Sequence, residues 1–134
     1  MAFMQWDDSF SVNVKEIDQQ HQKLVGMINE FYEHVGKDTG QAFRALLNSL
    51  VDYTQYHFST EEKYFKKFSY PDVSNHTEEH RKFTEKVLDV KNRLNQGRLV
   101  ISLEITSFLK EWLTHHIKIS DKAYSKFFND NGLF

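Results

Sequence analysis

The sequence has no cysteine, a single proline and only five glycines among its 134 residues. Without cysteine, disulfides, thiolate metal sites and iron–sulfur clusters are excluded. No stretch approaches the ~20 apolar residues of a membrane span, and the N-terminus lacks the basic and apolar segments of a signal peptide. The 17 basic and 19 acidic residues give a formal charge of −2, which does not indicate binding to nucleic acid or to an anionic membrane. We therefore expect a cytoplasmic protein without nucleic-acid or membrane partners.

Because proline and glycine are scarce, long segments of helical periodicity continue without interruption. Apolar residues recur every three or four positions, and no alternating strand pattern competes. Gly36, Gly40 and Gly97 lie between these segments, where turns belong, and Pro71 follows the end of the second segment. The predicted helices cover about 18–35, 41 to the mid-60s, 72–95 and 99–120.

Four amphipathic helices with short connections predict an all-α fold, an antiparallel up-down-up-down four-helix bundle. Asp18 is a plausible N-cap of the first helix. We expect one domain over residues 1–134, with an N-terminal arm (1–17) packed outside the bundle (18–120). The C-terminal segment (121–134) is expected to form a short helix.

Histidines are the unusual polar residues of the predicted core. In this topology the start of the first and third helices and the end of the second and fourth share one end of the bundle. Inward polar groups in one core layer are costly unless they are paired or bound to metal, so convergence from four helices predicts a metal site. His34 is assigned to solvent, and His116 is favoured over His115 by its place on the apolar stripe. The converging residues are His21, His57, Glu61, His76, His80 and His116.

Two other interpretations of the histidines remain open at this point. The stretch HTEEH (76–80) matches H-x-x-E-H, which one group of zinc peptidases uses, with Glu79 as the base. That interpretation leaves the histidines of the other helices unexplained, and Glu78 and Glu79 lie off the apolar stripe, as solvated surface charges do. A purely structural helical bundle would bind no metal at all.

The motifs resemble those of the hemerythrins, particularly the single-domain bacteriohemerythrins, over nearly the whole chain. The opening WDDSFSVNV is similar to the N-terminal arm of that family. The motifs that carry the resemblance are IDQQH with His21, HFSTE with His57 and Glu61, HTEEH with His76 and His80, and HIKISD with His116 and Asp121.

The resemblance implies a non-heme di-iron centre, with two carboxylates and a solvent-derived oxygen bridging the irons. Two six-coordinate metals have about twelve ligand positions. Five histidines, two bridging carboxylates and a bridging oxygen fill all but one, on the iron with two histidines, and in this family O₂ binds there. By the resemblance, one iron takes His76, His80 and His116, the other takes His21 and His57, and Glu61 and Asp121 bridge them.

The spacing of the last two ligands predicts an irregular helix. Asp121 is five residues beyond His116, which is about 140° around a regular α-helix, so a regular helix would direct its carboxylate away from the metal. We therefore predict a π-bulge or a helix end between Ile117 and Asp121.

The predicted function is reversible O₂ binding for storage, delivery or sensing, without enzymatic turnover. A di-iron enzyme, namely an oxidase or a peroxide or nitric oxide reductase, is the alternative, although the sequence has no Glu-x-x-His motif of the kind that ferritin-like sites use. An oxygen-requiring enzyme or a signalling protein as partner stays open. Tyr124 is a candidate hydrogen-bond donor to a ligand. Four residues match family positions that line the O₂ pocket: Leu24, Phe58, Trp112 and Leu113.

Overall fold

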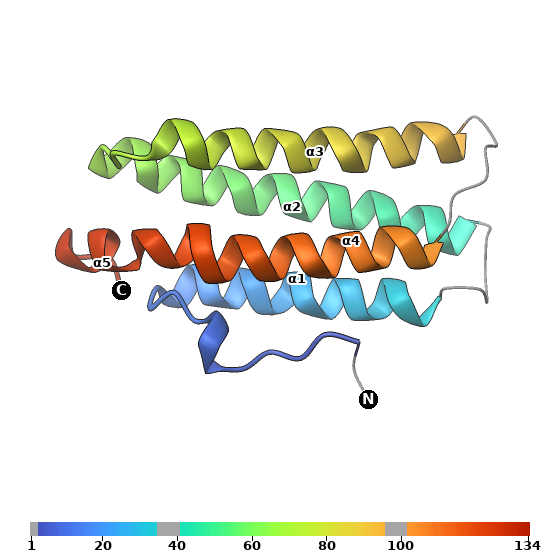
Figure 1. Ribbon diagram of the computed structural model, residues 1–134, viewed down its shortest axis with the longest axis horizontal. Helices are drawn as coiled ribbons and strands as arrows, with labels where there is room; N and C mark the ends of the chain where they lie inside the picture. The colour runs from blue at the N-terminus through green and yellow to red at the C-terminus, as the bar shows by residue number, and fades with distance from the viewer. Residues whose placement is uncertain (1–2, 35–40, 96–101) are drawn as a thin grey trace.

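Four long helices lie side by side, and consecutive helices run in opposite directions (Figure 1). The computed structural model describes residues 3–34, 41–95 and 102–134. The predicted antiparallel bundle is confirmed. Its elements are η1 (Asp8–Phe10), α1 (Lys15–Glu33), α2 (Gln41–Phe68), α3 (Val73–Asn95), α4 (Ser102–His115), the π-helix η2 (His116–Asp121) and α5 (Lys122–Asp130).

The junction between α2 and α3 follows the predicted stop. After Phe68, Ser69 adopts a left-handed backbone conformation with φ of 56°, and α3 begins at Val73, just past Pro71. The predicted start of the fourth helix near Leu99 lies outside the described residues. So do the predicted turns at Gly36, Gly40 and Gly97.

The first helix begins earlier than predicted, and Asp18 is not its N-cap. The residue before α1 is Val14, with an extended backbone, and no side chain caps the helix there. Asp18 lies within the first turn, where its carboxylate accepts hydrogen bonds from the Val12 backbone N–H at 2.8 Å and from Ser11 Oγ at 2.6 Å. The carboxylate therefore fixes the N-terminal arm, which ends at Val14, against the start of α1.

Replacing Asp18 by alanine is expected to lower the free energy of unfolding by about 2 kcal/mol, because two hydrogen bonds to an ionised acceptor are lost. Thermal or denaturant unfolding followed by circular dichroism measures the change. Asp130→Ala is the matched control. Its carboxylate pairs with Lys126 on the surface, where both side chains are more than half exposed, so the loss of stability is expected to be much smaller. Equal stabilities of the two variants would contradict this role of Asp18.

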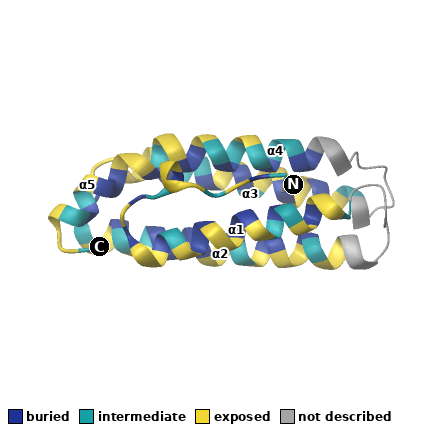
Figure 2. Ribbon diagram, turned by 90° about the horizontal axis from the view of Figure 1, so that it is seen from below, coloured by how far each residue is buried: buried dark blue, intermediate teal, exposed yellow. Residues whose placement is uncertain are grey.

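The N-terminal arm lies along α1 and α4, outside the bundle (Figure 2). Asn29 of α1 makes two hydrogen bonds of 2.8 Å with the backbone of Met4. The ammonium groups of Lys110 and Lys118 lie over the rings of Phe3 and Phe10. The predicted packing of the arm outside the bundle is confirmed.

The C-terminal segment forms α5, as predicted, and this helix covers one end of the bundle. Ser125 donates a hydrogen bond of 2.6 Å to the Val12 carbonyl, and Lys122 donates one of 2.9 Å to the Ser11 carbonyl. Tyr124 and Phe128 on the same helix are fully buried. The arm and α5 therefore brace the end of the bundle at which α1 begins.

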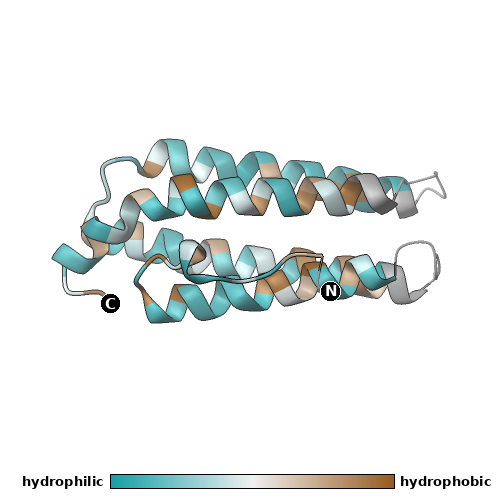
Figure 3. Ribbon diagram, turned by 60° about the horizontal axis from the view of Figure 1, so that its bottom comes forward, coloured by the Kyte–Doolittle hydropathy of each residue, from teal (hydrophilic) through white to brown (hydrophobic). Residues whose placement is uncertain are grey.

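Hydrophobic residues gather on the facing sides of the helices, and hydrophilic ones on the outer sides (Figure 3). Among the helices of the described residues, none combines the length and the apolar character needed to cross a membrane. The core is interrupted by polar side chains near the end covered by α5, and these form the candidate site.

Candidate metal centre

Seven polar side chains from α1, α2, α3 and η2 meet inside the bundle near the end covered by α5. All are buried, with exposed fractions of 0–3 %. The structure brings together every residue predicted as a metal ligand: His21 of α1, His57 and Glu61 of α2, His76 and His80 of α3, and His116 and Asp121 of η2.

The other two histidines stay outside this cluster. His115 is exposed while its neighbour His116 is buried, so it is His116 that faces the cluster. His34 caps the C-terminal end of α1, where its Nδ1 lies 2.9 Å from the Glu30 carbonyl oxygen of its own helix.

The π-helix η2 directs Asp121 to the same side as His116. The Lys122 N–H donates to the carbonyl of Ile117, five residues earlier, which is the hydrogen bond of a π-helix. As a result, Asp121 Oδ1 lies 3.1 Å from His116 Nε2. The predicted irregularity is confirmed.

Each carboxylate faces histidines from more than one helix. Asp121 Oδ1 lies 2.9 Å from His76 Nε2, and its Oδ2 lies 3.0 Å from His21 Nε2. Glu61 Oε1 lies 3.1 Å from His80 Nε2 and 3.5 Å from His57 Nε2. Both carboxylates therefore lie in the middle of the cluster, between the histidines.

The seven side chains form two groups that could each hold a metal ion, and the groups share the carboxylates Glu61 and Asp121. Within each group, one donor atom per residue lies within 4.8 Å of all the others. Histidine nitrogen and carboxylate oxygen suit first-row transition metals such as iron, manganese and zinc. We call the group that adds His76, His80 and His116 the three-histidine half, and the group that adds His21 and His57 the two-histidine half.

Several donor atoms of this cluster have no hydrogen bond within the described part of the chain. Buried polar atoms are normally hydrogen-bonded, so a group of such atoms directed at common points needs a further partner. A metal ion supplies it, and the donor set suits one. The atoms concerned are both ring nitrogens of His21, Glu61 Oε1, His76 Nε2 and both oxygens of Asp121.

Burial and mutual proximity shift the pKa values of these groups in the metal-free protein. Burial disfavours the charged form of His76 and His116, but the nearby Asp121 outweighs it and raises their pKa values to about 9 and about 10. Burial lowers the pKa of His57 to about 4. The pKa of Asp121 is lowered well below its usual value, because the nearby histidines, His116 foremost, outweigh its burial. The pKa of Glu61 is lowered too, so both carboxylates keep the anionic form that a metal ion requires.

Tyr124 reaches the cluster from α5, and its hydroxyl donates a short hydrogen bond to Glu61 Oε2. The ring is fully buried, and burial together with the nearby Asp121 and Glu61 carboxylates raises the pKa of the phenol well above its usual value. The phenol therefore stays protonated. It fixes one oxygen of Glu61 and leaves Oε1 directed at the histidines.

Three histidines each make a hydrogen bond through Nδ1, the ring nitrogen that faces away from the centre of the cluster. The sequence did not predict these hydrogen bonds. His57 Nδ1 lies 2.6 Å from Gln20 Oε1. His80 Nδ1 lies 3.2 Å from Glu62 Oε2, and His116 Nδ1 lies 2.9 Å from Glu79 Oε1. With Nδ1 donating a proton outward, Nε2 of each ring is the nitrogen left to bind a metal ion at the centre of the cluster once the ring is neutral.

Glu79 does not behave as the solvated surface charge that its place off the apolar stripe suggested. Its carboxylate is half-buried and also accepts hydrogen bonds from Ser120 Oγ, at 2.7 and 2.8 Å, so it links α3 to η2. Hydrogen bonds from His116 and Ser120 lower its pKa to about 2. Its partner is therefore a ring of η2, which does not support a peptidase site built on residues 76–80. Glu78 does pair on the surface, with Arg81.

A small apolar cavity lies beside the cluster. Its volume, measured as the space open to the centre of a water-sized sphere, is about 10 Å³. This leaves room for about one small molecule. Phe58 stacks on the His80 ring with centroids 3.7 Å apart, and Trp112 stacks on the His116 ring at 4.3 Å. All four residues predicted to line a ligand pocket line this cavity, together with others: Leu24, Ile28, Leu50, Thr54, Phe58, Phe83, Leu109, Trp112 and Leu113.

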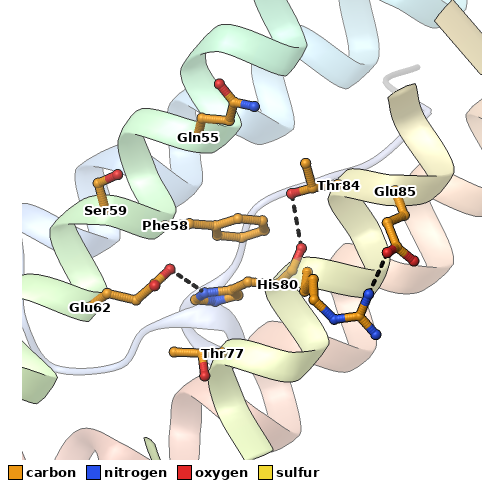
Figure 4. Close-up of a pocket in the computed structure, with 9 residues that line it drawn as sticks. Gln55, Phe58, Ser59, Glu62, Thr77, His80, Thr84 and Glu85 are labelled. Carbon is orange, nitrogen blue, oxygen red and sulfur yellow. Dashed lines mark hydrogen bonds and ion pairs between the residues drawn. The ribbon is translucent and has the colours of Figure 1, made fainter. Parts of the chain in front are cut away.

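A wider groove of about 440 Å³ opens between α2 and α3 on the surface (Figure 4). The ring of His80 lies at its base, between Phe58 and the carboxylate of Glu62, to which its Nδ1 is hydrogen-bonded. The side chain of Glu62 is 43 % exposed, so this carboxylate contacts solvent and also accepts a hydrogen bond from a ring of the buried cluster.

Fold and site together define a four-helix bundle with a buried metal-binding centre of histidines and carboxylates. Residues 12–127 match the model of the hemerythrin HHE cation-binding domain, and the chain belongs to that family. It is 33 % identical to a bacteriohemerythrin of Stenotrophomonas maltophilia over 93 % of this chain and 81 % of that one. It is 36 % identical to a hemerythrin-like protein of Naegleria gruberi over 89 % of this chain and 88 % of that one.

Solved structures agree with this assignment. A crystal structure of wild-type hemerythrin superposes with a TM-score of 0.90 at 29 % sequence identity, covering 93 % of this chain and 97 % of that one. The likeness thus extends over most of this chain and nearly the whole of the compared chain.

Proposed function

We propose that this protein binds O₂ reversibly at a di-iron centre formed by the seven buried ligands. The observation that carries the proposal is the division of the cluster into two groups that share Glu61 and Asp121. Two metal ions bridged by both carboxylates would use every donor in the cluster. The proposed ligands are His76, His80 and His116 for one iron, His21 and His57 for the other, and Glu61 and Asp121 for both.

The inequality of the two halves supports binding of a small molecule. With both carboxylates and a solvent-derived oxygen as bridges, three histidines complete six ligands on one iron, and two histidines leave one position open on the other. Two ferrous ions held by these residues would supply the two electrons, one from each ion, that O₂ takes on binding and returns on release. Five neutral imidazoles favour this mild chemistry, whereas the carboxylate-rich shells of di-iron oxidases favour higher oxidation states.

The residues around the centre would protect the bound molecule. The small apolar cavity between Leu24, Phe58, Trp112 and Leu113 holds about one small molecule and presents no charged side chain to it. Exclusion of water from such a site limits proton delivery and the oxidation of the metal that accompanies it. We propose that this cavity is the O₂ pocket, and that Tyr124 keeps Glu61 in its bridging position.

The test is a cycle of oxygenation on purified, iron-loaded protein. Elemental analysis is expected to give two irons per chain. The reduced protein is expected to gain an oxo-to-iron charge-transfer band in air and to lose it under argon, repeatedly and with constant amplitude.

Two outcomes would overturn the proposal. A band that forms once and persists under argon would show irreversible oxidation. Continuous consumption of O₂, peroxide or nitric oxide with a reductant would show that the centre is an enzyme. His115→Ala serves as the control variant, since His115 is exposed and outside the cluster, and it is expected to cycle like the wild type.

A further inference from the structure

The groups that accept hydrogen bonds from the histidine Nδ1 atoms are charged in one half of the centre and neutral in the other. In the three-histidine half, His80 and His116 donate to the carboxylates of Glu62 and Glu79, at 3.2 and 2.9 Å. In the two-histidine half, His57 donates to the amide oxygen of Gln20 at 2.6 Å. Within the described residues, the Nδ1 of His21 has no hydrogen-bond partner.

The orientation of the Gln20 amide is fixed by its surroundings. Its Nε2 donates to Thr60 Oγ1 at 3.2 Å, so its oxygen faces His57. Thr60 in turn donates to the Tyr56 carbonyl of its own helix. Gln20 is 6 % exposed, whereas Glu62 and Glu79 are 43 % and 39 % exposed, so the neutral partner is the one enclosed in the protein.

A carboxylate behind an imidazole makes the ring a stronger electron donor than an amide does, because the N–H proton is drawn toward the anion. The negative charge also stabilises a trivalent ion more than a divalent one, and this effect persists in the partly buried surroundings of the cluster. Two such carboxylates act on the three-histidine half and none acts on the Nδ1 of His57.

We propose that Glu62 and Glu79 make the ion held by His76, His80 and His116 easier to oxidise than the ion held by His21 and His57. This inference rests on the proposed function only insofar as two irons occupy the centre. In the titration described next, the oxidation is the transfer of one electron from a ferrous ion to hexacyanoferrate(III), which becomes hexacyanoferrate(II). Glu62, Glu79 and Gln20 act as positioning residues and form no bond to the metal.

The experiment is an anaerobic redox titration of the iron-loaded protein, which resolves the two one-electron steps. Glu79→Gln and Glu62→Gln are expected to shift the first oxidation step to a more positive potential and to narrow the separation of the steps. Gln20→Glu is expected to shift the second step to a more negative potential. Electron paramagnetic resonance of the one-electron state reports the change in the ferric site.

Glu78→Gln is the matched control. It removes the same charge one residue before Glu79, but Glu78 is on the surface, paired with Arg81, and it contacts none of the histidines of the cluster. The control is expected to leave both potentials unchanged. A second readout uses metal-free protein titrated with Co²⁺, for which Glu79→Gln should weaken binding by roughly 10-fold and Glu78→Gln should not.

The inference is wrong if Glu79→Gln shifts the potential of the first oxidation step no more than Glu78→Gln does. It is also wrong if Gln20→Glu shifts the potential of the second step in the direction in which Glu79→Gln shifts that of the first. Wild-type protein without two irons would overturn this inference and the proposed function together. Potentials that shift as expected in a protein that fails to release O₂ would support the inference and overturn the proposed function alone.

Discussion

Replacing Asp121 by alanine is expected to reduce the iron content from two ions per chain to less than one. Asp121 is the side chain whose two oxygens face opposite halves of the cluster, with Oδ1 2.9 Å from His76 and Oδ2 3.0 Å from His21. In the proposed di-iron centre, the change would remove one ligand from each ion and leave Glu61 as the single protein bridge. Two positive ions held close together without a second anion repel each other strongly at short range. Elemental analysis after gel filtration, together with the visible spectrum, measures the result.

Asp130→Ala controls for the loss of an acidic residue nearby, because Asp130 lies on the exposed side of α5 and pairs with Lys126. It is expected to keep two irons and the full charge-transfer band. Circular dichroism of both variants must show the helical content of the wild type. Retention of two irons by Asp121→Ala would refute the bridging role of this carboxylate.

Removal of the metal is expected to lower the melting temperature by roughly 15 °C. In the metal-free protein, seven polar side chains remain in a core layer with exposed fractions of 0–3 %, and some of their atoms lack hydrogen bonds. An ion that binds the native state alone at about a thousand times its Kd adds about 4 kcal/mol to the free energy of unfolding. For a domain of this size, each kcal/mol corresponds to roughly 4 °C. Calorimetry of iron-loaded and chelator-treated protein measures the difference.

The Asp121→Ala variant provides the control for this measurement too. If it holds less than one iron, the chelator should change its melting temperature far less than that of the wild type. Equal melting temperatures of loaded and stripped wild-type protein would indicate that the bundle is stabilised without metal, as expected of a purely structural protein.

The sequence was informative where spacing alone determines direction. Residues four apart on a helix face the same way, so His57 with Glu61 and His76 with His80 could be assigned to the interior before any coordinates. The up-down topology then placed them at one end of the bundle. The same angular reasoning required an irregular turn before Asp121, and η2 provides it.

The residues that accept hydrogen bonds from the histidine Nδ1 atoms could not be found in this way. Each lies about 100° from the apolar stripe of its helix, as surface residues also do. A signal was nevertheless present. Gln20 precedes His21, Glu62 follows Glu61, and Glu79 precedes His80. Each of these residues adjoins one ligand and accepts a hydrogen bond from a histidine of a later helix, namely α2, α3 and η2 in turn. A polar residue adjacent to a ligand at a helix–helix contact is therefore a candidate for this role.

The start of α1 was misplaced for a related reason. Asp18 has the residue type and position of an N-cap, but its carboxylate can equally accept hydrogen bonds from a preceding segment that folds back over the helix. Which of these occurs depends on the path of the arm, and that path is set by contacts distant in sequence, such as Ser125 with the Val12 carbonyl.

The single extra residue of η2 also sets the rotational phase of everything that follows it. In a regular helix Asp121 would lie about 140° around from His116; with one residue more in the turn it lies about 40° away. Because α5 continues directly from η2, Tyr124 and Phe128 are turned inward by the same 100°. The same extra residue thus directs the Asp121 carboxylate into the cluster and turns the aromatic rings of α5 over the end of the bundle. Deleting a residue from 117–120 would place the carboxylate four positions after His116, where a regular α-helix gives the same 40°, and substituting the exposed Lys118 or Ile119 would also leave the phase intact.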